Sequence, residues 1–115
     1  MPTFSSNDTQ IHYQTFGDVT QPAIIFSNSL GTNYAMWQSQ IDHFKDDFFV
    51  ICYDTRGHGA SSVPQGPYTL EQLGQDVVSL LEHLNIEKTV FCGISMGGLT
   101  GQWLAVNKPE RFSHV

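Results

Sequence analysis

Three short, continuously apolar segments alternate with segments of helical pattern along this chain of 115 residues. The apolar segments are Ala23–Phe26, Phe48–Tyr53 and Thr89–Cys92. A continuous apolar run of this length is typical of a β-strand that is buried on both faces. Because strands that alternate with amphipathic helices form parallel sheets with helices on both sides, we predict an α/β fold with a mostly parallel sheet.

The helical segments carry recognisable signals. We expect helices at Tyr34–Phe44, from Thr69 to near Asn85, and at Met96–Asn107. Thr69 and Gln72 stand at the spacing of a capping box, in which each side chain bonds the backbone N–H of the other residue. Behind this start, apolar residues recur at helical spacing: Leu70, Leu73, Val77, Leu80, Leu81 and Leu84. The last helix has its apolar residues on one side and is ended by a proline: Leu99, Trp103, Val106 and then Pro109.

Strand patterns also occur at both ends of the chain. Thr3–Ser6 and Gln10–Phe16 have the pattern of two strands, and the polar turn at residues 6–8 between them predicts a β-hairpin. At the other end, Arg111–Val115 is expected to lead into a further strand. A parallel strand at this edge would leave backbone groups unpaired, which native sheets avoid. We therefore expect residues 1–115 to be a portion of a larger domain.

The segment that joins the third apolar run to the last helix is Gly93-Ile94-Ser95-Met96-Gly97. A G-x-S-x-G pattern between a strand and a helix predicts a nucleophile elbow, a sharp turn that exposes the serine. The turn crowds the residues on either side of Ser95, so only glycine fits at 93 and 97. The serine would then lie at a helix N-terminus, and the N–H of Met96 is expected to be the first oxyanion donor. The alternative interpretation is an ordinary structural turn.

A polar loop, Ser27–Thr32, follows the first apolar segment. Enzymes with a nucleophile elbow place their second oxyanion N–H in the corresponding loop. By position we predict that Leu30 provides this N–H, with Ser29 as the next candidate. The alternative is an ordinary polar loop without a catalytic part.

A second loop, Asp54–Ser61, follows the next apolar segment and is dense in glycine and charge. We expect Asp54 and Arg56 to hold this loop and the adjacent strand end in place through ion-pair and backbone hydrogen bonds. A structural role is favoured over a catalytic one for both residues.

The charge and the cysteines limit the classes of protein that fit. The net charge is −6, whereas a nucleic-acid-binding protein normally carries a basic patch, so we expect no nucleic-acid partner. No apolar stretch is long enough to span a bilayer and Met1–Gln10 is polar, so we expect a cytoplasmic protein without a secretory leader or membrane contact. We interpret Cys52 and Cys92 as buried free thiols, with a disulfide as the alternative.

Taken together, the motifs resemble those of the α/β-hydrolase superfamily over essentially the whole chain. The hallmarks are D-x-R-G-x-G-x-S at Asp54–Ser61 and G-x-S-x-G-G at Gly93–Gly98. Many members carry His-Gly where this chain has Asn28-Ser29. The loop Ser27–Thr32, with Met36-Trp37 shortly after it, is similar to the 3-oxoadipate enol-lactonases of the β-ketoadipate pathway of aromatic catabolism.

The lactonase resemblance implies a substrate and a reaction. It implies that Ser95 attacks a small lactone, 3-oxoadipate enol-lactone, and that an acyl-enzyme is hydrolysed to 3-oxoadipate without a cofactor or a metal. Ser29 and Trp37 are the expected substrate contacts. The alternatives are a general carboxylesterase, a C–C hydrolase, a perhydrolase, or a non-catalytic receptor or scaffold on the same fold.

The same resemblance implies that residues 1–115 are the N-terminal portion of a single α/β-hydrolase domain. In this fold the triad runs serine, acid, histidine along the chain, so the acid and the histidine are expected after Val115. His114 is rejected as the base because it should lie at the far end of a neighbouring strand. The histidines before Ser95 are expected at the surface or in loops: His12, His43, His58 and His83. Residues 1–115 alone are expected to be inactive and poorly folded.

Overall fold

The computed structural model describes residues 3–6, 9–27, 34–54, 69–94 and 96–115. The strands are β1 (Thr3–Ser6), β2 (Thr9–Phe16), β3 (Ala23–Ser27), β4 (Phe49–Tyr53), β5 (Thr89–Gly93) and β6 (Phe112–His114). The α-helices are α1 (Gln38–Phe44), α2 (Leu70–His83) and α3 (Met96–Asn107), and short 3₁₀ helices occur at Tyr34–Trp37 (η1) and Pro109–Arg111 (η2). Among the described residues, no helix has both the length and the apolar character needed to cross a membrane.

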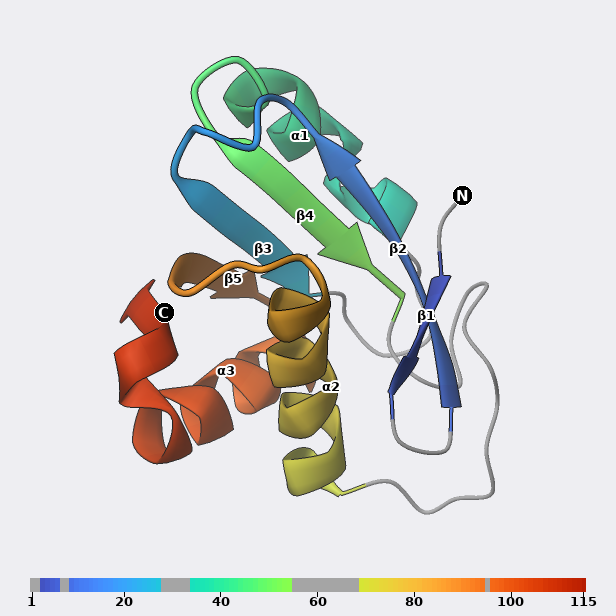
Figure 1. Ribbon diagram of the computed structural model, residues 1–115, viewed down its shortest axis with the longest axis vertical. Helices are drawn as coiled ribbons and strands as arrows, with labels where there is room; N and C mark the ends of the chain where they lie inside the picture. The colour runs from blue at the N-terminus through green and yellow to red at the C-terminus, as the bar shows by residue number, and fades with distance from the viewer. Residues whose placement is uncertain (1–2, 7–8, 28–33, 55–68, 95) are drawn as a thin grey trace.

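The strands form one mixed sheet in the order β1-β2-β4-β3-β5-β6. Figure 1 shows β2, β4 and β3 side by side in it. β1 and β2 form the predicted antiparallel hairpin, and β2 pairs antiparallel with β4. The pairs β3–β4, β3–β5 and β5–β6 are parallel. The prediction of an opening hairpin followed by a mostly parallel sheet is therefore confirmed.

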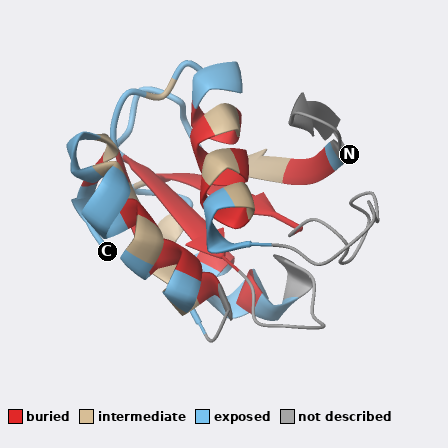
Figure 2. Ribbon diagram, turned by 90° about the horizontal axis from the view of Figure 1, so that it is seen from below, coloured by how far each residue is buried: buried red, intermediate tan, exposed pale blue. Residues whose placement is uncertain are grey.

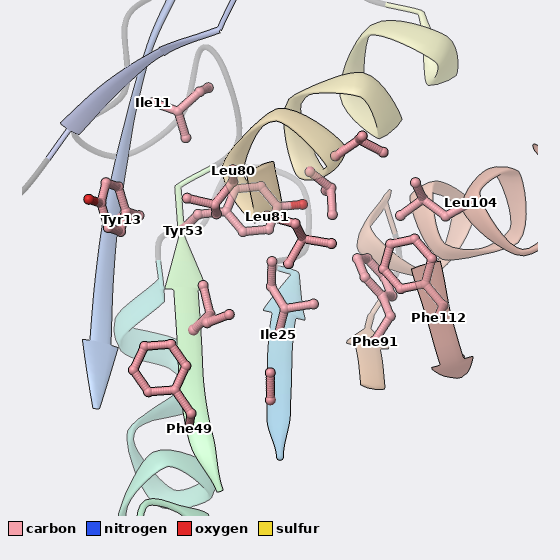
Figure 3. Packing of buried hydrophobic residues seen from close by; sticks show 14 residues of the cluster. Ile11, Tyr13, Ile25, Phe49, Tyr53, Leu80, Leu81, Phe91, Leu104 and Phe112 are labelled. Carbon is pink, nitrogen blue, oxygen red and sulfur yellow. The ribbon is translucent and has the colours of Figure 1, made fainter. Parts of the chain in front are cut away.

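Each face of the sheet has its own hydrophobic cluster. Ile25 and Phe91 point to the face covered by α2 and α3, where Leu80 and Leu104 pack against them (Figure 3), and Ile51 belongs to the same cluster. Alternate strand residues point to the opposite face, which is covered by η1 and α1 with Trp37 and Ile41: Ile24, Phe26, Val50 and Cys52. Figure 2 shows the buried strands between helices whose outer sides are exposed. Burial on both faces is the physical reason for the continuous apolar runs.

Helix α2 begins and ends where its sequence predicts. Thr69 Oγ1 accepts the Gln72 N–H at 3.1 Å and Gln72 Oε1 accepts the Thr69 N–H at 2.9 Å, which completes the capping box. At the other end Asn85 has a φ of 59°, in the left-handed region. The N–H of Ile86 then bonds the Leu81 carbonyl, as in a Schellman motif. Both ends of the helix thus satisfy backbone groups that its own turns cannot.

Helix α3 has the predicted bounds but buries a different side. Leu99 and Val106 are 50% and 79% exposed, whereas the buried positions recur at helical spacing on the other side: Gly97, Thr100, Gly101 and Leu104. Small residues at three of these four positions bring the helix close to the sheet. A Cβ added at Gly101 would lie 2.9 Å from the Phe91 ring. Of the expected apolar side, Trp103 packs against the core, but the prediction is wrong for Leu99 and Val106. The buried glycines and threonine were missed because they do not contribute to a hydrophobic pattern.

Candidate active site

The carboxyl ends of β3 and β5 meet at the start of the predicted elbow. Ser27, the last residue of β3, pairs with Gly93, the last residue of β5. The Ser27 carbonyl also accepts the N–H of Ile94 at 3.3 Å. In open α/β sheets, ligands bind outside the carboxyl ends of the strands. The structure therefore places Ser27 and Gly93, the first residues of the two segments predicted to form the site, at the same edge of the sheet.

The turn from β5 into α3 is tight, and two glycines make it possible. The Gly97 N–H donates to the Ile94 carbonyl at 3.0 Å, which closes the turn around position 95. A Cβ added at Gly93 would lie 2.3 Å from the Gly97 carbonyl oxygen, and one added at Gly97 would lie 2.4 Å from the Ser27 carbonyl oxygen. Real Cβ atoms do not approach backbone atoms so closely. The predicted need for glycine on both sides of the serine is confirmed.

The residues predicted to act in the site are only partly within the described structure. Ser95, Leu30 and Ser29 lie outside the described residues, and their roles stay predictions. Met96 is the first residue of α3. The first N–H groups of a helix have no acceptor within it, which suits the predicted oxyanion donor. Trp37, the last residue of η1, is 7% exposed and stacks on Phe26 with ring centroids 4.7 Å apart, so its side chain lies in the core.

A buried hydrogen bond beneath the elbow was not predicted. Ser27 Oγ lies 2.7 Å from Tyr53 Oη, on the face that α2 and α3 cover. Burial raises the pKa of the Tyr53 hydroxyl; the bond to Ser27 acts in the other direction, and the charge of Asp76 raises it further. The phenol therefore stays neutral at physiological pH. In the sequence, each of these polar groups ends an apolar strand, but nothing in the pattern indicates that the two are partners.

The described histidines lie away from the elbow. His114 pairs with Val90 on the opening part of β5, as expected, and His43 and His83 are exposed. His12 is only 9% exposed and lies on β2, so the expectation of a surface or loop position is wrong for it. β2 and β5 are separated by β4 and β3, and three strand spacings are about 14 Å. This distance is too long for a base that must hydrogen-bond a serine in the elbow.

Asp54 and His12 join the end of β4 to β2. The Asp54 N–H donates to the His12 carbonyl at 2.9 Å, and the Asp54 side chain is 2% exposed. This backbone bond agrees with the structural role expected for Asp54. Arg56 and His58 lie outside the described residues, as does the rest of the second loop.

The two cysteines are free thiols on strands that flank β3. Cys52 and Cys92 are both in register with Phe26, one on either side of it. Two strand spacings separate them by about 10 Å, which is too far for a disulfide. Burial raises the pKa of both thiols, and for Cys52 the nearby Asp54 charge adds to the effect, bringing the pKa to about 12. The interpretation as free thiols is confirmed, although Cys92 is only partly buried.

The raised pKa of Cys52 predicts a thiol that does not react in the folded protein. At pH 9 an unperturbed thiol is about half ionised, whereas a thiol with a pKa of about 12 is ionised in roughly one molecule in a thousand. Iodoacetamide at pH 9 should therefore leave Cys52 unmodified until denaturant is added, as peptide mass spectrometry can show. Alkylation of Cys52 in the native protein at the rate of a free peptide thiol would contradict the buried position.

A pocket of about 320 Å³ adjoins the elbow on the side of α3. Its walls are residues of β5, α3 and the last residue of the chain: Phe91, Cys92, Gly93, Gly98, Gly101, Gln102 and Val115. β6 pairs only with Thr89 and Val90, so the remaining edge of β5 forms one wall. Trp37, the predicted substrate contact within the described residues, does not line this pocket, and we do not assign the substrate to it.

A strand–turn–helix unit with two sterically required glycines, at the carboxyl edge of a mostly parallel sheet, is the arrangement of a serine hydrolase of the α/β type. Comparison with known families agrees with this geometry. The profile of the alpha/beta hydrolase fold family matches residues 22–115, and the chain belongs to this family.

Individual relatives point to one branch of the family. The chain is 64% identical over 98% of its length to 3-oxoadipate enol-lactonase 2 of Acinetobacter baylyi, and 54% identical over 89% to 3-oxoadipate enol-lactonase 1 of the same organism. The crystal structure of the enol-lactonase from Burkholderia xenovorans LB400 superimposes with a TM-score of 0.94 at 47% identity, over 96% of this chain. The chain spans 42%, 38% and 44% of the lengths of these three proteins.

Proposed function

We propose that the chain is the N-terminal portion of a single α/β-hydrolase domain whose full-length form opens 3-oxoadipate enol-lactone to 3-oxoadipate. The observation that carries the proposal is the elbow turn at Ile94–Gly97, packed against the end of β3. The 64% identity to an enol-lactonase supports the choice of substrate. The alternative of a non-catalytic scaffold is disfavoured, because a scaffold has no need for so tight a turn around a serine.

In the proposed mechanism, Ser95 attacks the lactone carbonyl carbon and the ring oxygen leaves as the tetrahedral intermediate collapses. The N–H groups of Met96 and Leu30 hold the oxyanion, and water then hydrolyses the acyl-enzyme. The leaving group stays tethered to the acyl group, so ring opening yields one product. A base must take the proton of Ser95, and none of the described histidines is placed to do so. We therefore propose that the acid and the histidine lie beyond Val115, in the part of the relatives' length that the chain does not span.

The proposal is tested on the full-length protein with purified enol-lactone. We expect the absorbance of the lactone to disappear with saturation kinetics and 3-oxoadipate to appear in equal amount by chromatography. A linear ester of similar size, such as a methyl ester of a short dicarboxylic acid, should be hydrolysed at least about tenfold less efficiently in kcat/KM. A reversed preference would favour the carboxylesterase alternative, and no turnover of either compound would overturn the hydrolase proposal.

We propose that the protein works in the cytoplasm on a small-molecule substrate, without nucleic acid, membrane or cofactor. The two free thiols support a reducing compartment. The net charge of −6 supports the absence of a nucleic-acid partner.

A further inference from the structure

Tyr53 and Ser27 form a buried pair directly beneath the elbow. Tyr53 ends β4 and Ser27 ends β3, and their side chains are 3% and 1% exposed. Their hydroxyl oxygens lie 2.7 Å apart. Neither side chain reaches the solvent, so neither is positioned to contact a substrate that enters from the edge of the sheet.

The backbone of Ser27 is connected to both ends of the elbow turn. Its carbonyl accepts the Ile94 N–H at 3.3 Å, and the same carbonyl oxygen lies only 2.4 Å from the position of a Cβ built on Gly97. The turn itself is closed by the bond from the Gly97 N–H to Ile94. A shift of Ser27 would therefore move the turn in which the sequence places Ser95.

We propose that Tyr53 is a positioning residue for the elbow, acting through its hydrogen bond to Ser27. The inference rests on the proposed function, because it concerns the geometry of the same nucleophile. The bond holds the end of β3 at a fixed distance from β4, and the Ser27 carbonyl transmits that position to the turn. Misplacement of a reacting group by about 1 Å can cost a hundredfold in rate, so a partial loss of this support should be visible in kcat.

The test compares two buried tyrosines whose hydroxyl groups have different hydrogen-bond partners. Tyr13 pairs with Tyr53 across β2 and β4. The Tyr13 hydroxyl is hydrogen-bonded to His83 at 3.1 Å, whereas the Tyr53 hydroxyl is hydrogen-bonded to Ser27. In Figure 3 the two hydroxyl groups point in opposite directions. In the full-length enzyme, Tyr53→Phe should lower kcat for lactone opening about tenfold with KM changed less than twofold. Tyr13→Phe should leave both constants within about twofold.

A double-mutant cycle separates positioning from general loss of stability. Ser27→Ala alone should lower kcat by a factor similar to that of Tyr53→Phe, and the double variant should be no slower than either single one. Thermal melting should show all variants folded at the assay temperature. A kcat for Tyr53→Phe within twofold of the unchanged enzyme, equal losses for the two tyrosine variants, or additive losses in the cycle would overturn the inference. If Tyr53→Phe does not fold, Ser27→Ala against Tyr13→Phe decides by the same criteria.

The failure of this inference and the failure of the proposed function are distinguishable. The unchanged enzyme must first open the lactone, and Ser95→Ala must abolish that activity. If those results hold and Tyr53→Phe has no effect on kcat, only the positioning role is rejected. If the unchanged enzyme has no lactonase activity, the proposed function is rejected before any tyrosine variant is measured.

Discussion

Replacement of Ser95 by alanine in the full-length protein is expected to lower kcat for lactone opening by about 10⁴- to 10⁶-fold. The variant removes the hydroxyl that we propose forms the acyl-enzyme, while the elbow glycines and the start of α3 are unchanged in sequence. Binding should persist, because alanine is smaller than serine and fits wherever serine fits. Product formation in a stopped assay and product affinity by calorimetry would measure the two effects separately.

A matched serine elsewhere in the chain serves as the control for this variant. Ser39 is exposed on α1, on the opposite side of the sheet from α3, and Ser39→Ala should leave kcat and KM unchanged. Retention of more than about one hundredth of the activity by Ser95→Ala would reject a serine nucleophile. In that case the proposed covalent mechanism fails even if the lactone is the substrate.

Replacement of Gly97 by alanine is expected to destabilise the full-length protein by about 3 kcal/mol and to lower kcat about a hundredfold. The new methyl group would fall 2.4 Å from the Ser27 carbonyl oxygen and 2.8 Å from its carbon. Both are backbone atoms of a buried strand, so no side chain can rotate away to relieve the clash. Either α3 or β3 must move. A loss of this size corresponds to a melting temperature about 6–12 °C lower, which calorimetry can measure.

The adjacent glycine provides the contrast. A Cβ on Gly98 would meet its nearest neighbour, the Gly93 carbonyl oxygen, at 3.8 Å, an ordinary contact. Since alanine favours a helix interior over glycine by about 0.5–1 kcal/mol, Gly98→Ala should keep or slightly raise the melting temperature. Equal destabilisation by the two substitutions would show that the elbow is not the tight turn described above.

Most of the fold could be predicted because its signals are local. The apolar runs of β3, β4 and β5, the capping box of α2 and the bounds of α3 each depend on residues within one element. The prediction of two obligatory glycines also depends on one turn, and the distances around Gly93 and Gly97 confirm it. The prediction of which side of α3 is buried used hydrophobicity alone and was wrong for Leu99, because α3 buries Gly97 and Gly101 and exposes Leu99.

The site was less accessible to sequence reasoning because its support comes from distant residues. Tyr53 and Ser27 are 26 positions apart, and only the pairing of β3 with β4 brings their hydroxyl groups together. The burial of His12 also depends on a contact between distant residues, so sequence reasoning placed it wrongly. Its residue type suggests the surface, but its place on β2, where its carbonyl bonds the end of β4, buries it.

The sequence by itself determined the class of protein, the strand–turn–helix unit around Ser95 and the need for glycine on both sides of it. Each of these follows from short-range sterics and from the period of apolar residues. Tertiary structure alone decided the order of the strands, the side that α3 buries and the connection from Tyr53 through Ser27 to the elbow. These depend on which strands pair and how closely helices approach the sheet, and such contacts join residues that no local pattern relates.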